Sequence, residues 1–342
     1  MAALKSETLA HRNDQTGVPL RSRVFGAIRT LNRLGAATAP VSNLPGRMRP
    51  VRRAMARTLG IAPERPLPEF QRQTLVRWFD RRRRNGVVRR PGPEAAPSQG
   101  ELTFLADSFT TFTEPAIGQA AIELLERAGW RVRLQSTGCC GRSALSKGLL
   151  DDAKAKAAAL AGALARESAP GSPIVGCEPS CIFTLQDEHT ALLPDDPNVR
   201  DVSGRVQQVE ALLSAAIDEG RLKLAEDSWL SGRRLLYHGH CHQKAEVGTA
   251  ATVALLSRIP GVQVIELDAG CCGMAGSFGF EAEHYGVSMT VGRDRLFPAI
   301  DQEPADSVVA ATGVSCRQQI QHGTARRALH PVELVRGALV DA

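Results

Sequence analysis

Two copies of a vicinal cysteine pair followed by glycine divide the chain into comparable halves. The copies are Cys139-Cys140-Gly141 and Cys271-Cys272-Gly273, and all eight cysteines lie between residues 139 and 316. Neighbouring cysteines cannot form an unstrained disulfide with each other, because disulfide geometry requires their Cα atoms to lie farther apart. Two adjacent thiolates on one loop can instead bind different metals of one cluster. The pattern predicts metal binding over its alternative, a set of small buried apolar side chains.

The duplication extends to the expected secondary structure. The offset is 132 residues from Cys139 to Cys271 and 135 residues from Cys181 to Cys316. Each half contains three short apolar runs typical of strands: 102–105, 132–134 and 173–176 in the first half, and 234–237, 264–267 and 308–311 in the second. A helix-like stretch follows the first run of each half, at 115–127 and 247–259. The chain is therefore predicted to be α/β, with duplicated cysteine-rich βαβ-type halves and parallel sheets.

A strongly basic segment precedes these halves. Residues 1–90 contain 19 Arg and one Lys against five acidic residues, a net charge of +15, and the remainder carries −9, which together give +6. Helical pieces are expected at 24–34 and 70–84, separated by Pro- and Gly-rich joints. We expect this segment to dock on an acidic partner or an anionic membrane surface. Nucleic acid is not an expected partner, because the run Arg81–Arg84 is typical of a solvated helix end.

Four parts are predicted along the chain. They are the basic helical segment 1–90, a linker 91–100 with the sequence PGPEAAPSQG, a first half 101–230 and a second half 231–342. The sequence has no apolar run near the roughly 18 residues needed to span a bilayer, and its start, MAALKSETLAHRND, lacks secretory signal character. Clustered cysteines in such a chain favour a reducing compartment. We expect a cytoplasmic protein, with a peripheral position at the inner face of a membrane as the alternative.

The second half offers the more complete set of metal ligands. Its cysteines fall just past the C-terminal ends of the expected strands, where open α/β sheets place their ligands. The four thiols belong to Cys241, Cys271, Cys272 and Cys316. Four thiolates are the usual complement of an iron-sulfur cubane, so we expect a cluster here.

The first half offers a smaller set. Its corresponding thiols are Cys139, Cys140 and Cys181, and Phe109 stands at the position that matches Cys241. The remaining cysteine, Cys177, aligns with Thr312. We expect a more labile or incomplete centre, or one completed by another ligand, for which Cys177 and Asp107 are the candidates.

Histidines surround one of the thiols. The motif YHGHCHQK places His238, His240 and His242 next to Cys241. Zinc is the competing metal, because Cys and neutral His are its usual ligands. The CxxC spacing typical of zinc sites is absent from this motif, which favours an iron-sulfur cluster. The histidines are expected to hydrogen-bond cluster sulfur or tune its potential from outside the ligand set, with ordinary loop polar residues as the alternative.

Several motifs together resemble a known family. CCGRSALSKGLL, EPSC, HGHCHQKAEVGT, DAGCCGMAGSFGFEAEHY and GVSCRQQIQHGTARRALHP are similar to the cysteine-rich (CCG) region of FAD-linked D-2-hydroxyacid dehydrogenases, such as D-lactate dehydrogenases and the iron-sulfur subunit of glycolate oxidase. The similarity spans about residues 100 to 335. More distantly, the motifs resemble the B subunit of heterodisulfide reductase and the iron-sulfur subunit of anaerobic glycerol-3-phosphate dehydrogenase. The family signature ends in CxxC, whereas this chain has Gly313 at the first cysteine of that pair.

The basic segment resembles the same family. HRNDQTGVPLRSRVFGAIRTLNRLG and LGIAPERPLPEF are similar to the stretch that follows paired ferredoxin motifs in long, fused members. Those members also carry a flavin domain, and neither part is recognisable in this sequence. The resemblance thus implies a split-gene subunit or a fragment that begins just after a ferredoxin region. FAD and the ferredoxin-type clusters would then lie on a partner or a missing segment.

The resemblance implies electron transfer as the function. The chain would carry an iron-sulfur cluster, of 4Fe-4S type, and pass electrons from the flavin toward a quinone or cytochrome. It would be the electron-transfer component of an oxidoreductase, and no residue is assigned a catalytic role in substrate oxidation. Two alternatives stay open: a thiol or disulfide reductase of the heterodisulfide-reductase type, and a noncatalytic metal-binding interaction module.

Overall fold

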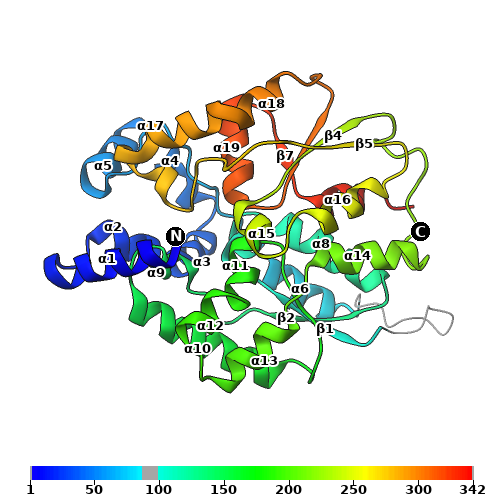
Figure 1. Cartoon of the computed structure of the whole chain (residues 1–342), viewed down its shortest axis with the longest axis horizontal. Helices are drawn as coiled ribbons and strands as arrows, with labels where there is room; N and C mark the ends of the chain where they lie inside the picture. The colour runs from blue at the N-terminus through cyan, green and yellow to red at the C-terminus, as the bar shows by residue number, and fades with distance from the viewer. Residues whose placement is uncertain (1, 87–98, 341–342) are drawn as a thin grey trace.

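Two parallel sheets with the same central topology form the framework of the computed structural model, which describes residues 2–86 and 99–340 (Figure 1). The first sheet has the order β2-β1-β3, and the second has the order β5-β4-β6-β7. The strands are β1 (Glu101–Leu105), β2 (Arg131–Gln135), β3 (Ile174–Val175), β4 (Arg234–His238), β5 (Gln263–Glu266), β6 (Val308–Ala311) and β7 (Ala328–Leu329). Every named pairing is parallel. The predicted α/β class and duplicated parallel sheets are confirmed, and β7 is an addition that the sequence did not reveal.

Strand composition follows position in the sheet. The central strands β1 and β4 are almost completely buried and read as near-continuous apolar runs, as expected for parallel strands covered on both faces. The strand β2 lies at an edge, where its residues alternate between exposed and partly buried positions. Arg133 on this strand pairs with Glu101 on β1 at 2.9 Å. The first sheet therefore has one polar edge at β2, whereas its other edge strand, β3, is apolar and buried.

Helices connect the strands in each half. Those of the first half are α7 (Ser108–Phe112), α8 (Pro115–Arg127), α9 (Arg142–Leu145), α10 (Leu150–Glu167), α11 (Pro179–Ile182), α12 (Glu188–Leu192), α13 (Pro197–Arg205) and α14 (Val209–Asp218). Those of the second are α15 (Cys241–Glu246), α16 (Ala250–Ser257), α17 (Ala282–Val291), α18 (Phe297–Asp301), α19 (Val314–Thr324) and α20 (Pro331–Gly337). Short turns η2 (Phe183–Leu185), η3 (Phe278–Phe280) and η4 (Gly292–Leu296) complete them. The helix expected at 115–127 is confirmed, whereas the one expected at 247–259 is shorter, because the turn at Gly248, with φ of +73°, separates α15 from α16.

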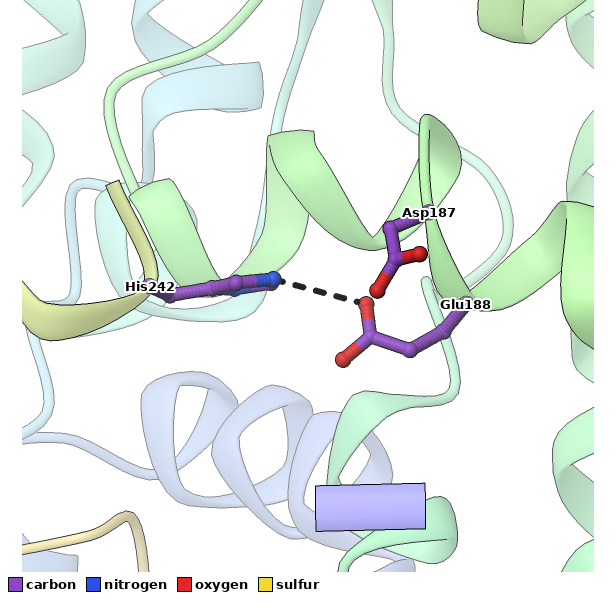
Figure 2. A group of neighbouring side chains, drawn as sticks. All are labelled: Asp187, Glu188 and His242. Carbon is purple, nitrogen blue, oxygen red and sulfur yellow. Dashed lines mark ion pairs between the residues drawn. The ribbon is translucent and has the colours of Figure 1, made fainter. Parts of the chain in front are cut away.

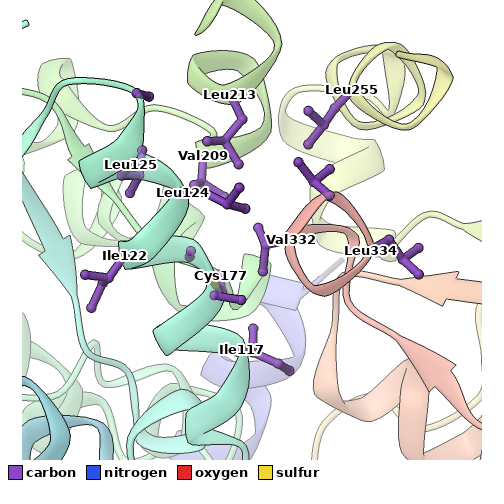
Figure 3. Close-up of a cluster of buried hydrophobic side chains, with 14 of the residues drawn as sticks. Ile117, Ile122, Leu124, Leu125, Cys177, Val209, Leu213, Leu255, Val332 and Leu334 are labelled. Carbon is purple, nitrogen blue, oxygen red and sulfur yellow. The ribbon is translucent and has the colours of Figure 1, made fainter. Parts of the chain in front are cut away.

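One apolar core joins the two halves (Figure 3). It lies between α8 and α14 of the first half and α16 and α20 of the second. Its members include Leu124, Leu213, Leu255 and Val332, each fully buried. Since both halves contribute to the same core, neither sheet is packed independently of the other. The domain boundary expected at 230/231 falls in the turn region before β4 and stays a prediction.

The basic N-terminal segment is helical, as expected. It contains α1 (Ala2–Thr16), α2 (Leu20–Gly26), α3 (Ile28–Ala37), η1 (Val41–Asn43), α4 (Leu44–Arg47), α5 (Arg49–Leu59) and α6 (Leu75–Arg84). The single helix expected at 24–34 is interrupted at Ala27, and the helix expected at 70–84 begins only at Leu75. Thr74 causes the later start, because its hydroxyl caps α6 by accepting a hydrogen bond from the Arg77 N–H at 3.2 Å. Of the linker expected at 91–100, residues 91–98 lie outside the described residues.

This segment packs against both halves (Figure 1). Arg65 is 1% exposed, and its guanidinium donates to the Gly279 carbonyl at 3.0 Å and to Gln319 Oε1 at 2.6 Å. Leu75 and Phe79 on α6 belong to the shared core. The segment is therefore an integral part of the structure as well as a source of positive charge. Among the described residues, no helix is long and apolar enough to cross a membrane.

Ionisation of Glu210 is expected to destabilise the folded protein at neutral and higher pH. This side chain on α14 is 5% exposed, and burial raises its pKa from 4.5 to about 7. The folded state favours the protonated form, so stability is greatest below the unfolded pKa and falls as pH rises from about 4.5 to about 7. One pKa unit corresponds to about 1.4 kcal/mol, so the full loss is on the order of 3 kcal/mol.

We predict that Glu210→Gln raises the free energy of unfolding at pH 8 and changes it little at pH 4.5. Urea unfolding at both pH values, on protein in one metal-loading state, measures this difference. Glu226→Gln, an exposed acidic position, is the control and should change stability equally little at both pH values. Equal effects of Glu210→Gln at the two pH values would contradict the prediction.

Candidate metal centres

The second half brings together the four thiols predicted from the sequence. Cys241 is the first residue of α15 after β4, Cys271 and Cys272 follow β5, and Cys316 lies in the first turn of α19 after β6. The Cys272 thiol interacts with those of Cys271 and Cys316, and the Cys241 thiol interacts with that of Cys271. Cys272 and Cys316 are buried, whereas Cys241 and Cys271 are exposed. The three loops at the C-terminal edge of the sheet therefore form one continuous thiol cluster.

Hydrogen bonding within this cluster favours the thiolate form of two cysteines and raises the pKa of the two that donate to them, Cys241 and Cys272. Hydrogen bonds from Cys241 and Cys272 lower the pKa of the Cys271 thiol. The Cys316 thiol also has a lowered pKa, first through a hydrogen bond from Cys272 and then through His238. Because the deprotonated thiol is the form that binds metals, Cys271 and Cys316 are the two thiols of this cluster that are prepared for a cation.

The glycine of each CCG motif is required by a close approach of a helix. Gly273 has φ of +91°, and a Cβ atom there would lie 2.2 Å from the Ser288 carbonyl oxygen of α17. The N–H of Gly273 donates to Cys271 Sγ at 3.3 Å. Gly141 has φ of +78°, and a Cβ atom there would lie 3.1 Å from the carbonyl oxygen of Ala153 on α10. Glycine therefore allows each vicinal cysteine loop to pack directly on a helix.

The first half forms a second, smaller thiol cluster. The Cys140 thiol interacts with those of Cys139 and Cys181. These three cysteines line a small pocket together with Asp107 and with Arg29 from α3. Arg29 donates to two backbone carbonyls beside the pocket, at 3.0 Å and 2.7 Å. A guanidinium of the N-terminal segment thus lies beside the first thiol cluster.

Cys177 lies in a different environment. Its side chain is 3% exposed and belongs to the shared apolar core, as Figure 3 shows. Cys140 and Cys181, by contrast, pack in a separate apolar cluster of the first half. Burial raises the pKa of the Cys177 thiol well above its usual range. Its assignment as a metal ligand stays a prediction, and its surroundings favour the role of a small buried side chain.

Asp107 is the candidate oxygen ligand that lines the pocket of the first cluster. It is 4% exposed and caps α7, with Oδ1 accepting from the N–H groups of Phe109 at 2.7 Å and Thr110 at 3.1 Å. Burial raises the pKa of this carboxyl. Phe109 lies in the first turn of α7, as Cys241 does in α15, so the aromatic side chain takes the place of the fourth thiol.

The three predicted histidines have different roles in the structure. His238 is 1% exposed and hydrogen-bonds Cys316. His240 caps α15 through Nδ1, which accepts from the His242 N–H at 3.2 Å, and its Nε2 lies 3.3 Å from Ser180 Oγ. His242 faces Glu188 instead of the thiols, and burial lowers its pKa to about 3. His238 therefore hydrogen-bonds a thiol as the sequence suggested, and His240 acts on the Cys316 thiol electrostatically.

Gly313 stands where the resembled family has the first cysteine of its CxxC pair, and the structure leaves no room for a side chain there. A Cβ atom at this position would lie 2.2 Å from Cδ2 of the His240 ring. The imidazole therefore occupies the space that a cysteine side chain would need. His240 and Gly313 form a matched pair, and the departure from the family signature leaves the four second-half thiols unaffected.

Buried polar contacts join the two thiol clusters. Glu178, three residues before Cys181, accepts a hydrogen bond from the Val314 N–H at the start of α19, at 2.8 Å. Arg317, next to Cys316, pairs with Glu114 at 2.6 Å across the same boundary. These side chains are missed by sequence reasoning, since only folding brings positions 136 and 203 residues apart into contact.

The donor sets fit iron-sulfur ligation to different degrees. Four connected thiols, of which Cys271 and Cys316 have lowered pKa values and Cys241 and Cys272 raised ones, supply the number of ligands of a cluster held by four cysteines. Three thiols and a neighbouring carboxylate in the first half supply a mixed set. The second-half site is thus the better match.

We predict that Cys272→Ser sharply lowers the iron bound by anaerobically reconstituted protein, because this thiol interacts with two others of the cluster. Iron and sulfide analysis with electron paramagnetic resonance measures the loss. Unchanged iron content and an unchanged spectrum would contradict the assignment.

For the first half, we predict that Asp107→Asn lowers iron occupancy and Cys177→Ser does not. Asparagine retains a helix-capping oxygen and removes the anionic ligand, so the variant separates metal binding from helix capping. Iron content and thermal stability of both variants provide the measurement. Reduced iron in Cys177→Ser at unchanged stability would assign that thiol to the centre.

Comparison with known proteins agrees with this duplicated site. A cysteine-rich domain model, CCG, matches residues 106–186 and 235–321. The C subunit of anaerobic glycerol-3-phosphate dehydrogenase from Escherichia coli (strain K12) is 29% identical over 330 residues, which cover 95% of this chain and 79% of that protein. D-2-hydroxyglutarate dehydrogenase of the same strain is 26% identical over 228 residues, 66% of this chain and 21% of that protein. Lactate utilization protein A of an Exiguobacterium species is 28% identical over 231 residues, 66% of this chain and 90% of that protein.

The two matched regions coincide with the two thiol clusters. The first begins directly after β1 and ends just past α11, which carries Cys181. The second begins within β4 and ends within α19, which carries Cys316. The resemblance inferred from the motifs is thereby confirmed. The chain belongs to the family of proteins that carry the cysteine-rich CCG domain, and it holds two copies of that domain.

Proposed function

We propose that this chain is an iron-sulfur electron-transfer component of a flavin-dependent dehydrogenase, of the type that oxidises 2-hydroxyacids such as D-lactate or glycolate. In this role the chain binds a 4Fe-4S cluster at the second-half thiols. It accepts electrons that originate at an FAD on another polypeptide or segment, with a ferredoxin-type component between them. It delivers them toward a quinone or cytochrome and does not oxidise the substrate alone.

The observation that carries the proposal is the four-thiol cluster at the edge of the second sheet. An iron-sulfur cluster supplies one-electron transfer when bound, and its potential responds to nearby charge, hydrogen bonds and burial. In this chain, His238 hydrogen-bonds the Cys316 thiol, and the charge of the buried Arg65 interacts with Cys272. Arg29 has the corresponding place at the first cluster. Relatives named for dehydrogenase and lactate utilization support the oxidoreductase class.

A surface on the N-terminal segment is suited to partner docking. Exposed apolar side chains gather along α3 to α5, namely Leu31, Leu34, Val41, Leu44 and Met48. Arg49, Arg53 and Arg57 on α5 are exposed beside them. Apolar groups rimmed by positive charge fit an acidic protein surface, and we assign this surface to the flavin- or ferredoxin-bearing partner. A peripheral position on an anionic membrane is the other arrangement that such a surface permits.

Electron transfer from a partner provides the test. The reconstituted chain alone should show no oxidation of D-lactate, glycolate, D-2-hydroxyglutarate or glycerol 3-phosphate with an artificial acceptor. Addition of the flavin-bearing partner and one substrate should bleach its visible absorption and change its electron paramagnetic resonance spectrum. Turnover by the chain alone would overturn the proposed role, and the substrate that gives reduction identifies the dehydrogenase type.

Charge variants test the docking surface and leave the core intact. Deletion of residues 1–90 would instead remove residues of the shared core. We predict that Arg49→Gln, Arg53→Gln and Arg57→Gln combined slow electron transfer several-fold at low salt, where electrostatic steering is strongest. The matched control changes Arg81, Arg83 and Arg84 on α6 to Gln. Equal rates for both triple variants would reject α5 as the docking site, and loss of vesicle binding alone would indicate the membrane arrangement.

Each alternative has a distinct result. A thiol or disulfide reductase would reduce a disulfide substrate with an artificial electron donor in the absence of a flavin partner. A noncatalytic metal-binding module would contain no redox-active iron. The proposed function requires redox-active iron together with dependence on the flavin partner.

A further inference from the structure

A polar cluster separate from the thiols lies between α12 and α15, where the two halves meet (Figure 2). It consists of Asp187 and Glu188 of the first half and His242 of the second. One carboxylate oxygen of each acid and one ring nitrogen of the histidine all lie within 4.8 Å of one another. The proposed electron-transfer role assigns no part to these side chains.

Buried atoms of this cluster lack partners. The His242 side chain is 9% exposed, and its Nδ1 has no hydrogen-bond partner. Its Nε2 points toward Glu188 Oε2, as Figure 2 shows. The two atoms are 3.6 Å apart, a distance too long for a hydrogen bond. Glu188 Oε2 is itself buried and without a hydrogen-bond partner. Native proteins rarely leave two such buried atoms without partners in one cluster, since an unsatisfied buried polar group costs roughly 1–3 kcal/mol.

The separation of these two atoms fits a shared metal ion. Zinc binds imidazole nitrogen at about 2.0–2.1 Å and carboxylate oxygen at about 2.0–2.2 Å. Two such ligands in a tetrahedral site lie about 3.4 Å apart, close to the observed 3.6 Å. Asp187 adds a third donor. Catalytic zinc sites, unlike structural ones, typically have three protein ligands and one open coordination position.

The surrounding charges also fit a dication. Arg142, beside the first CCG motif, forms an ion pair with Glu188 Oε1 and leaves Oε2 free to face His242. Glu246 Oε1 lies 3.9 Å from His242 Nε2. Three carboxylates and one guanidinium give −3 + 1 = −2, which a divalent ion neutralises. Arg142 thus orients Glu188, as side chains that contact metal ligands do in other metal sites.

We propose that Asp187, Glu188 and His242 form a binding site for one divalent first-row transition ion, with Zn²⁺ as the matching ion. The ion bridges α12 and α15 and so links the first CCG half to the helix that begins at Cys241. It uses nitrogen and oxygen ligands only and is independent of metal bound at the thiols.

A second group of similar composition provides a contrast. Glu281, Glu283 and His284 also lie close together. There, however, Glu281 pairs with Lys147 and with His284, and Glu283 pairs with Arg21. Both oxygens of Glu281 and of Glu283 already have cationic partners, whereas Glu188 Oε2 has no hydrogen-bond partner, so this group is the matched control.

Zinc binding to iron-loaded protein tests the proposal. Iron loading occupies the thiols, a chelating resin removes loose metal, and Zn²⁺ is then added and quantified by mass spectrometry. We expect about one tightly bound zinc per chain. X-ray absorption at the zinc edge should show nitrogen and oxygen ligands at about 2.0–2.2 Å and no sulfur at about 2.3 Å.

Variants locate the ion. Glu188→Gln and, separately, Asp187→Asn should weaken zinc binding at least ~tenfold, since even loss of a supporting group outside the ligand set has effects of that size. Iron content should stay unchanged in both, which shows that they fold and that the thiol centres are intact. Glu283→Gln should bind zinc as the unaltered protein does. Absence of bound zinc, sulfur at the zinc edge, or unaltered binding in both variants would overturn the proposal, whatever the outcome for the thiol clusters.

Discussion

Burial of four helices between the two sheets is the constraint on which the rest of the structure depends. The helices α8 and α14 come from one half, and α16 and α20 from the other, and their apolar side chains form a single core (Figure 3). Apolar burial contributes roughly 25 cal/mol per Å² and has no direction of its own, so it holds the halves together without specifying their chemistry. Because this core fixes the relative position of the sheets, loops at the C-terminal ends of both are held in fixed proximity.

Buried polar contacts add the specificity that apolar burial lacks. Glu178 and Arg317 each connect one half to the other within a few residues of a cysteine. In a low-dielectric interior such contacts are strong when satisfied and costly when broken. They therefore define the positions of the cysteine-bearing helices α11 and α19 relative to each other. The Glu188–His242 pair is the exception, since Glu188 Oε2 and His242 Nδ1 are buried and have no hydrogen-bond partner, and this difference singles it out as a candidate ion site.

The positive charge of the N-terminal segment has two uses in the fold. Arg29 and Arg65 project inward, each to the neighbourhood of a different thiol cluster. Arginines on α5 remain exposed on the surface. A segment that seemed from its composition to be a docking element thus also places charge where it acts on the candidate centres. Net charge alone cannot separate these uses, because it carries no information on which residues are buried.

The amino-acid sequence by itself determined the duplicated parallel architecture and the grouping of seven thiols into two clusters. These follow from local features, since apolar runs specify strands, and cysteines just past parallel strands converge at one sheet edge. It also suggested helix 115–127 correctly, because a proline start and apolar periodicity are local signals. Tertiary structure alone decided the shared core, the position of Cys177 inside it, and the orientation of His242 away from the thiols. It also paired Gly313 with the His240 ring and Glu188 with His242, because contacts between residues far apart in the chain depend on how the halves pack, and no local pattern records that packing.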